Sequence, residues 1–274
     1  MTDKLVTVDW VAEHSGDPNV RLVEVDVDTE AYGTGHIEGA VGWNWTTQLQ
    51  DQVQRDIISK AGLEELLSAS GINNDTHVVL YGDNNNWFAA YALWLLELYG
   101  HEHASLMDGG RLKWMADSRP TTTDVPSYPT TSYAAKDANP ALRAQRDEVL
   151  QAVGGAASQL VDVRSPAEYN GEIIAPPGMT ETAQRAGHIP GAKNIPWARA
   201  VNEDGTFRSP EDLKTLYGDA GVQEGTPTIA YCRIGERSSH TWFVLKHILG
   251  YSDVKNYDGS WTEYGSLIGV PVEK

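Results

Sequence analysis

The chain has 274 residues, one cysteine and a formal net charge of −17. This acidity argues against nucleic acid and anionic membranes as partners, because both require a basic face. No apolar run approaches the roughly 20 residues that a membrane span needs. The length suits one large domain or two of ordinary size.

The N-terminal segment MTDKLVTVDW lacks the basic and apolar regions of a signal peptide. A single cysteine cannot form an internal disulfide, which favours a reducing compartment. We therefore expect a cytoplasmic protein.

Short apolar runs alternate with helix-like stretches along the chain. The runs predict buried strands at 22–25, 77–81, 103–107, 160–163, 228–231 and 254–257. The clearest helix is predicted to start at Ser238 or Ser239 and to end at Gly250, a natural C-cap. Strands that alternate with helices predict an α/β fold with mostly parallel sheets flanked by helices.

The second half of the chain repeats the first. GHIEGAVGWNW at 35–45 resembles GHIPGAKNIPW at 187–197, and RLVEVDVDTEAY at 21–32 resembles QLVDVRSPAEY at 159–169. Four further pairs share one offset of 150 residues: Tyr81 and Tyr231, Gly100 and Gly250, Asp108 and Asp258, Gly109 and Gly259. The first block is offset by only 138, so the second copy carries an insertion near 171–185.

The repeat predicts two homologous domains of similar fold. We place a non-catalytic domain at 1–120 and a catalytic domain at 145–274. The segment 121–144 between them is rich in Pro, Thr and Ser, which predicts an extended linker.

The lone cysteine, Cys232, lies between a predicted strand and the clearest helix, where ligands of α/β sheets bind. Gly235 lets the short turn CRIGER curl so that several N–H groups point inward. The helix adds its positive N-terminal end, and Arg233 and Arg237 add positive charge. These features predict a lowered thiol pKa and a reactive thiolate at Cys232.

The loop around the cysteine is the predicted substrate site, because its arginines can clamp an anion. The predicted binding residues are Arg233, Ile234, Gly235, Glu236, Arg237 and Ser238, with Arg185 as a further candidate. In the first copy the offset places Gly82 opposite Cys232, and GDNNNW has neither nucleophile nor arginine. Asp26, Asp162, His36 and His188 recur between the copies and are therefore expected to hold the scaffold.

With these features the chain resembles the rhodanese family, the tandem-domain thiosulfate and mercaptopyruvate sulfurtransferases. The resemblance covers nearly the whole chain and includes both GHI-x-GA segments, the loop CRIGER and the C-terminal VKNYDGSWTEYG. It implies two rhodanese-like domains and a double displacement. Cys232 as thiolate attacks the outer sulfur of thiosulfate, sulfite leaves, and a Cys232 persulfide passes its sulfur to cyanide or a thiol.

The resemblance implies a small anionic sulfur donor, a thiophilic acceptor, and no metal or organic cofactor. Arg233 favours thiosulfate, because mercaptopyruvate-type members tend to have glycine there. Ile234 and Glu168 stand where some thiosulfate enzymes have basic residues, and we expect Glu168 to pair with Arg164 instead. Two alternatives stay open: a 3-mercaptopyruvate sulfurtransferase, and a persulfide carrier or sensing module without turnover.

A phosphatase or reductase of the related cysteine-loop class is disfavoured. Those phosphatases need an arginine six residues after the cysteine, whereas Arg237 is five after it and Ser238 is sixth. A reductase with a disulfide relay needs a second cysteine. The acceptor protein, the pathway and the oligomeric state are not readable from the sequence.

Overall fold

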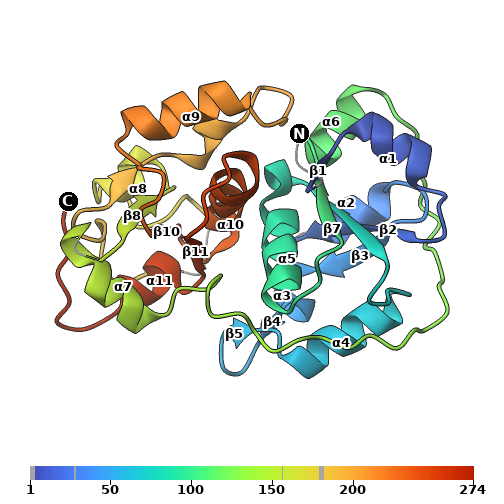
Figure 1. Cartoon of the computed structure of the whole chain (residues 1–274), viewed down its shortest axis with the longest axis horizontal. Coiled ribbons are helices and arrows are strands. Elements are labelled where there is room, and N and C mark those ends of the chain that lie inside the picture. The colour runs from blue at the N-terminus through green and yellow to red at the C-terminus, as the bar shows by residue number, and fades with distance from the viewer. Residues whose placement is uncertain (1–3, 28, 156, 179–181) are drawn as a thin grey trace. The chain divides into compact units, whose positions relative to one another are not determined.

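A computed structural model describes residues 4–27, 29–155, 157–178 and 182–274 (Figure 1). The chain divides into two compact units. The first contains the residues up to Asn139 with Glu203–Thr206, and the second contains Pro140–Asn202 with Phe207–Lys274. Residues 1–3 of the N-terminal segment and 179–181 of the predicted insertion lie outside the described residues.

The first unit is an alternation of short strands and helices. Its elements are β1 (Leu5–Val6), α1 (Val8–His14), β2 (Val20–Asp26), α2 (Thr29–Thr34), β3 (Val41–Asn44), α3 (Trp45–Gln48), β4 (Gln50–Asp51), β5 (Asp56–Ile57), α4 (Lys60–Ala69), β6 (His77–Tyr81), η1 (Asn84–Asn86), α5 (Trp87–Leu98), β7 (Ala104–Met107) and α6 (Gly110–Ala116).

The second unit repeats this alternation with fewer strands. Its elements are α7 (Arg146–Ala152), η2 (Val153–Gly155), β8 (Gln159–Asp162), α8 (Pro166–Tyr169), β9 (Lys193–Asn194), η3 (Trp197–Ala200), α9 (Pro210–Asp219), β10 (Thr228–Tyr231), α10 (Glu236–Phe243), the π-helix η4 (Val244–Ile248), β11 (Val254–Tyr257) and α11 (Ser260–Tyr264).

Each unit is built on a parallel sheet, and the two sheets follow the same order. The first runs β1-β7-β6-β2-β3 and the second β11-β10-β8-β9. Tyr81 pairs with Glu24 in the first, as Tyr231 pairs with Asp162 in the second. Glu24, and not Asp26, is therefore the counterpart of Asp162, which corrects the match we made from the sequence.

Helices lie against the sheet of each unit (Figure 1), and buried apolar residues of the strands and helices pack between them. In the first unit α1 and α6 pack on one face with β2, β6 and β7, and ten of the twelve residues of α5 are buried. In the second unit α7 and α11 pack on β8, β10 and β11. Burial of these side chains stabilises the folded state by about 25 cal/mol for each Å² of apolar area removed from water.

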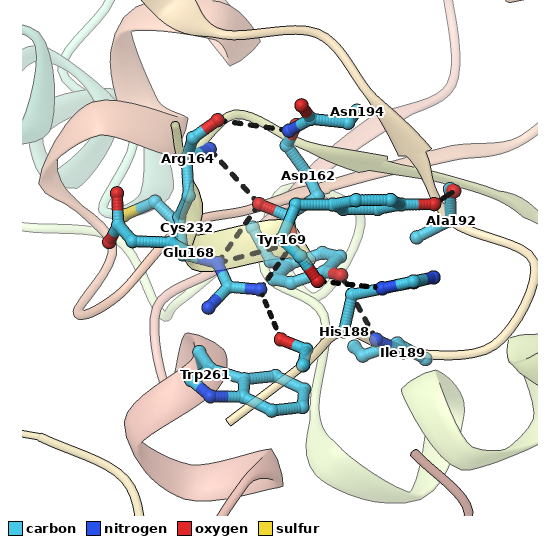
Figure 2. Close-up of polar contacts among 12 residues, drawn as sticks. Asp162, Arg164, Glu168, Tyr169, His188, Ile189, Ala192, Asn194, Cys232 and Trp261 are labelled. Atoms are coloured by element: carbon cyan, nitrogen blue, oxygen red, sulfur yellow. Dashed lines mark hydrogen bonds and ion pairs between the residues drawn. The ribbon is translucent and has the colours of Figure 1, made fainter. Parts of the chain in front are cut away.

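The two GHI-x-GA segments make the same contacts in both units. The ring of His36 stacks on Tyr32 at a centroid distance of 3.8 Å, and that of His188 stacks on Tyr169 at 3.5 Å. Nδ1 of each histidine hydrogen-bonds the carbonyl oxygen of the same tyrosine. The predicted scaffold role of both histidines is confirmed, and Figure 2 shows the pair in the second unit.

The strands and the main helix differ from the prediction mostly at their ends. All six predicted strands are present, but α10 begins at Glu236 and not at Ser238. Its N-cap is Gly235, which has no side chain to cap the helix. The helical amides therefore start inside the loop CRIGER, close to the cysteine. None of the helices in the described part of the chain has the length and apolar composition to span a bilayer.

Candidate active site

Cys232 follows the inner strand β10 directly, at the carboxyl end of the second sheet. Gly235 turns the chain back with a left-handed φ of 102°. A Cβ on Gly235 would lie 2.9 Å from Cα of Asp258, so both the φ and the close approach require glycine.

The start of α11 holds the loop from the other side. The amides of Trp261 and Thr262 donate to the carbonyl oxygens of Cys232 and Arg233, both at 3.0 Å. Because these carbonyls point toward α11, the loop can turn an N–H group toward the sulfur. The amide of Gly235 donates to Sγ of Cys232 at 3.1 Å.

The sulfur of Cys232 is fully buried among polar groups. Besides the Gly235 amide, its neighbours are Oε2 of Glu236 at 3.2 Å, Oγ of Ser238 at 3.6 Å and Oγ of Ser260 at 3.9 Å. The loop thus brings together Cys232, Gly235, Glu236 and Ser238, four residues that the sequence analysis singled out. Ile234 is also buried, as the apolar member of the loop.

Both loop arginines lie against carboxylates. Arg237 donates through Nη1 and Nη2 to the two oxygens of Glu168, each at 3.0 Å, and its Nε lies 3.6 Å from Oε1 of Glu236. Nη2 of Arg233 lies 3.7 Å from the same Oε1. Two positive and two negative side chains therefore balance one another around the sulfur, and all four are buried.

The predicted pairing of Glu168 with Arg164 is wrong. Arg164 instead pairs with Asp162, with Nη2 at 2.6 Å from Oδ2, and also donates to the carbonyl oxygen of Gly187 (Figure 2). Residues i and i+2 of an extended chain point to the same side, so Arg164 reaches Asp162 locally. Glu168 is the third residue of α8, where it forms a capping box with Ser165 and faces Arg237.

These features of fold and loop agree with comparison to known proteins. The family model of the rhodanese-like domain matches twice, over residues 7–117 and 145–267. The chain belongs to the rhodanese family.

Relatives of this rhodanese have names from sulfur chemistry. A Haloferax volcanii protein named "Putative thiosulfate sulfurtransferase" is 57% identical over 99% of this chain and 96% of its own length. The sulfur carrier protein TtuD of Thermus thermophilus is 54% identical over 98% of this chain and 96% of its own length. The structure of the 3-mercaptopyruvate sulfotransferase SseA of Escherichia coli aligns with a TM-score of 0.82, at 28% identity, over 94% of this chain and 98% of SseA.

The electrostatics of the rhodanese loop differ from our expectation of a thiol with a lowered pKa. Burial and the carboxylate of Glu236 raise the pKa of Cys232, and Arg237 and Ser238 offset this only in part. Burial by itself would raise the pKa of Glu168, but Arg237 and Ser165 hold it below its ordinary value. We expected a lowered thiol pKa from the arginines and the helix end alone. The carboxylates of Glu168 and Glu236 neutralise these arginines, and the sequence did not reveal that pairing.

Arg185 lies against the C-terminal segment of the chain, not against the sulfur. Its guanidinium donates to four backbone carbonyl oxygens, those of Tyr264, Gly265, Leu267 and Val270, at 2.8–3.2 Å. With its hydrogens directed at these carbonyls, Arg185 has a scaffold role in this structure. We therefore leave it out of the proposed substrate site.

The matching loop of the first unit is closed by an asparagine. Oδ1 of Asn86 accepts from the amide of Gly82, and its Nδ2 donates to the carbonyl oxygen of Met107. A Cβ on Gly82 would lie 2.3 Å from the carbonyl oxygen of Val25, so no cysteine fits there without a shift of the backbone. The first unit therefore keeps the fold with glycine at the position that matches Cys232.

Sequence reasoning missed Glu168, Ser260 and Asn256 as parts of the site. Ser260 has a left-handed φ of 52°, which is unusual for a residue other than glycine. Its Oγ accepts from the amide of Cys232 and donates to the carbonyl oxygen of Tyr257. The offset of 150 placed Ser260 opposite Gly110, and this exchange of glycine for serine was the available signal.

Proposed function

We propose that this rhodanese is a thiosulfate sulfurtransferase that carries sulfur on Cys232. The observation that supports this proposal is the position of Sγ in the loop CRIGER, where the amide of Gly235 donates to it and Glu236 links it to Arg233 and Arg237. An anionic sulfur needs N–H donors, and an anionic donor and leaving group need positive side chains.

The proposed reaction has two steps. Sγ attacks the outer sulfur of thiosulfate, a Cys232 S–S bond forms, and the S–S bond of thiosulfate breaks with its electron pair leaving on sulfite. A thiophilic acceptor such as cyanide or a small thiol then attacks the outer sulfur of the persulfide and regenerates Cys232. We place this chemistry in the reducing cytoplasm, where a lone thiol persists.

The proposal is tested with the variant Cys232→Ser. Wild-type protein incubated with thiosulfate should gain the mass of one sulfur atom and should form thiocyanate when cyanide is added. The serine variant should do neither, while its melting curve stays close to that of the wild type. Undiminished thiocyanate formation by the variant would refute the assignment.

A second candidate is a sulfur carrier that passes persulfide sulfur to another protein. The name of the Thermus thermophilus relative favours this reading. The balanced charges at the loop also suit donors less charged than thiosulfate, including 3-mercaptopyruvate. Steady-state rates with thiosulfate and 3-mercaptopyruvate separate these cases: a carrier loads sulfur once but shows little turnover with small acceptors.

A further inference from the structure

Glu236 occupies a special position in the site, because its two oxygens face different partners. Oε2 lies 3.2 Å from Sγ of Cys232, whereas Oε1 lies 3.6 Å from Nε of Arg237 and 3.7 Å from Nη2 of Arg233. The carboxylate is buried, at 2% exposure, in the first turn of α10. It therefore joins the nucleophile to both positive side chains.

The thiol proton has a clear acceptor in this arrangement. Sγ–H donates to Oε2 of Glu236, and the amide of Gly235 donates to Sγ. The hydroxyl protons of the two nearby serines have closer acceptors. Oγ of Ser238 lies 2.6 Å from Oδ1 of Asn256, and Oγ of Ser260 lies 2.7 Å from the carbonyl oxygen of Tyr257. The resting arrangement is thus a thiol hydrogen-bonded to a carboxylate.

The charged groups that face this pair come from three elements. Arg233 belongs to the loop and Arg237 to α10, and Glu168 of α8 lies on the far side of Arg237. Burial and Glu236 together raise the pKa of the Cys232 thiol, which favours its protonated form. A nucleophile in this condition needs a base within hydrogen-bond reach at the moment of attack.

We propose that Glu236 is the base that takes the proton of Cys232 during sulfur loading and returns it during sulfur release. The proposal rests on the proposed function and adds a residue role to it. In loading, the Sγ–H bond breaks, its proton goes to Oε2, and the new Sγ–S bond forms as sulfite leaves as a dianion. In release, the acceptor takes the outer sulfur, the S–S electron pair returns to Sγ, and Glu236 protonates it.

Proton transfer to Glu236 also changes the charge balance when an anion needs it. Once Glu236 is neutral, Arg233 and Arg237 face only the carboxylate of Glu168 among the four charged groups described above. The site gains one positive charge as the persulfide anion and sulfite appear. The same proton transfer thus activates the nucleophile and frees positive charge for the products.

The test is the variant Glu236→Gln, with Glu211→Gln as a matched control. Glu211 also lies in the first turn of a helix, α9, but is exposed. Single-turnover loading from thiosulfate is followed by sulfite release across a pH series. We expect loading by Glu236→Gln to fall about 100-fold at neutral pH, because the base is lost. Loading should recover at alkaline pH with a midpoint below that of the wild-type thiol, since Glu236 no longer raises the pKa of Cys232. The control should follow the wild type.

Alkylation of Cys232 by iodoacetamide provides a readout that needs no sulfur donor. Wild-type protein should react at neutral pH, because Glu236 takes the thiol proton as Sγ attacks. Glu236→Gln should react slowly at neutral pH and gain rate only as alkaline pH ionises the thiol. Glu236→Asp should keep part of the rate at neutral pH, which distinguishes a proton acceptor from a part of the fold.

Three outcomes would overturn the role of Glu236. These are wild-type loading by Glu236→Gln at neutral pH, an equal loss at every pH, and an unchanged alkylation profile. If wild-type protein does not load sulfur from any donor, the proposed function fails, and the alkylation profile then decides the role of Glu236 by itself.

Discussion

Arg237 binds both carboxylate oxygens of Glu168 at 3.0 Å, across 69 residues of sequence. This pair ties the loop CRIGER to α8 and fixes the guanidinium beside Glu236. An arginine held in this way is oriented before any substrate arrives, which reduces the entropy lost on binding.

The variant Glu168→Gln should lose both stability and activity. Removal of one partner from a buried ion pair leaves an uncompensated charge, which costs about 3–5 kcal/mol. Urea unfolding measures this loss, and sulfur loading of the folded variant measures the displacement of Arg237. Glu148→Gln is the control, because Glu148 forms a partly exposed pair with Lys255 and should cost about 1 kcal/mol or less.

Arg233→Gly should weaken the use of thiosulfate more than the use of 3-mercaptopyruvate. Nη2 of Arg233 lies 3.7 Å from Oε1 of Glu236, the carboxylate that contacts the sulfur. Thiosulfate carries one more negative charge than 3-mercaptopyruvate. A charge-assisted hydrogen bond contributes about 1.5–3 kcal/mol, so kcat/KM for thiosulfate should fall by about 10- to 100-fold. An equal loss with both donors would contradict this reading of Arg233.

Arg185→Ala should destabilise the second unit without changing the chemistry at Cys232. The variant leaves four buried or partly buried carbonyl oxygens without their guanidinium donor. We expect a loss of about 2–4 kcal/mol in the free energy of unfolding. Sulfur loading per folded molecule should stay within about twofold of the wild type, by contrast with a loss of about tenfold or more if Arg185 bound the donor. Arg146→Ala, at an exposed arginine, is the control.

Asp26→Asn should stabilise the protein at neutral and alkaline pH. Burial, with the hydrogen bonds and charges of Asp83 and Glu24, raises the pKa of Asp26 to about 10. Between the ordinary pKa of 3.8 and the folded-state pKa of about 10, the folded protein keeps a proton on Asp26 that the unfolded chain has released. The free energy of unfolding therefore falls as pH rises through this interval. Asparagine can still accept from the amide of Asp83, as Asp26 does at 2.7 Å.

The check on Asp26 is the free energy of unfolding at about pH 5 and about pH 8. With a pKa of about 10 in the folded state, Asp26 should make the wild type lose up to about 4 kcal/mol more than Asp26→Asn over this interval. The exposed Asp17→Asn should behave as the wild type. Destabilisation by Asp26→Asn at the higher pH would show that Asp26 is ionised in the folded protein.

Parts of the fold and site were predictable because short-range patterns encode them. Apolar runs marked all six predicted strands, and the offset of 150 residues showed that Cys232 has a glycine counterpart. Gly235 marked the tight turn, since its φ and its contact with Asp258 tolerate no side chain. The start of α10 was predicted wrongly because a serine is the more usual N-cap. The N-cap is Gly235, so the first helical amides lie within the loop, near the sulfur.

By itself, the sequence determined the tandem repeat, the position of Cys232 after a buried strand, and the length of the loop that holds it. These features depend on residue type and spacing along one stretch of chain. Only the tertiary structure decided that Arg237 pairs with Glu168, that Arg185 binds the C-terminal carbonyls, and that the carboxylate of Glu236 faces the sulfur. Charge pairing and pKa depend on burial and on which side chains converge from distant segments, and folding alone brings these together.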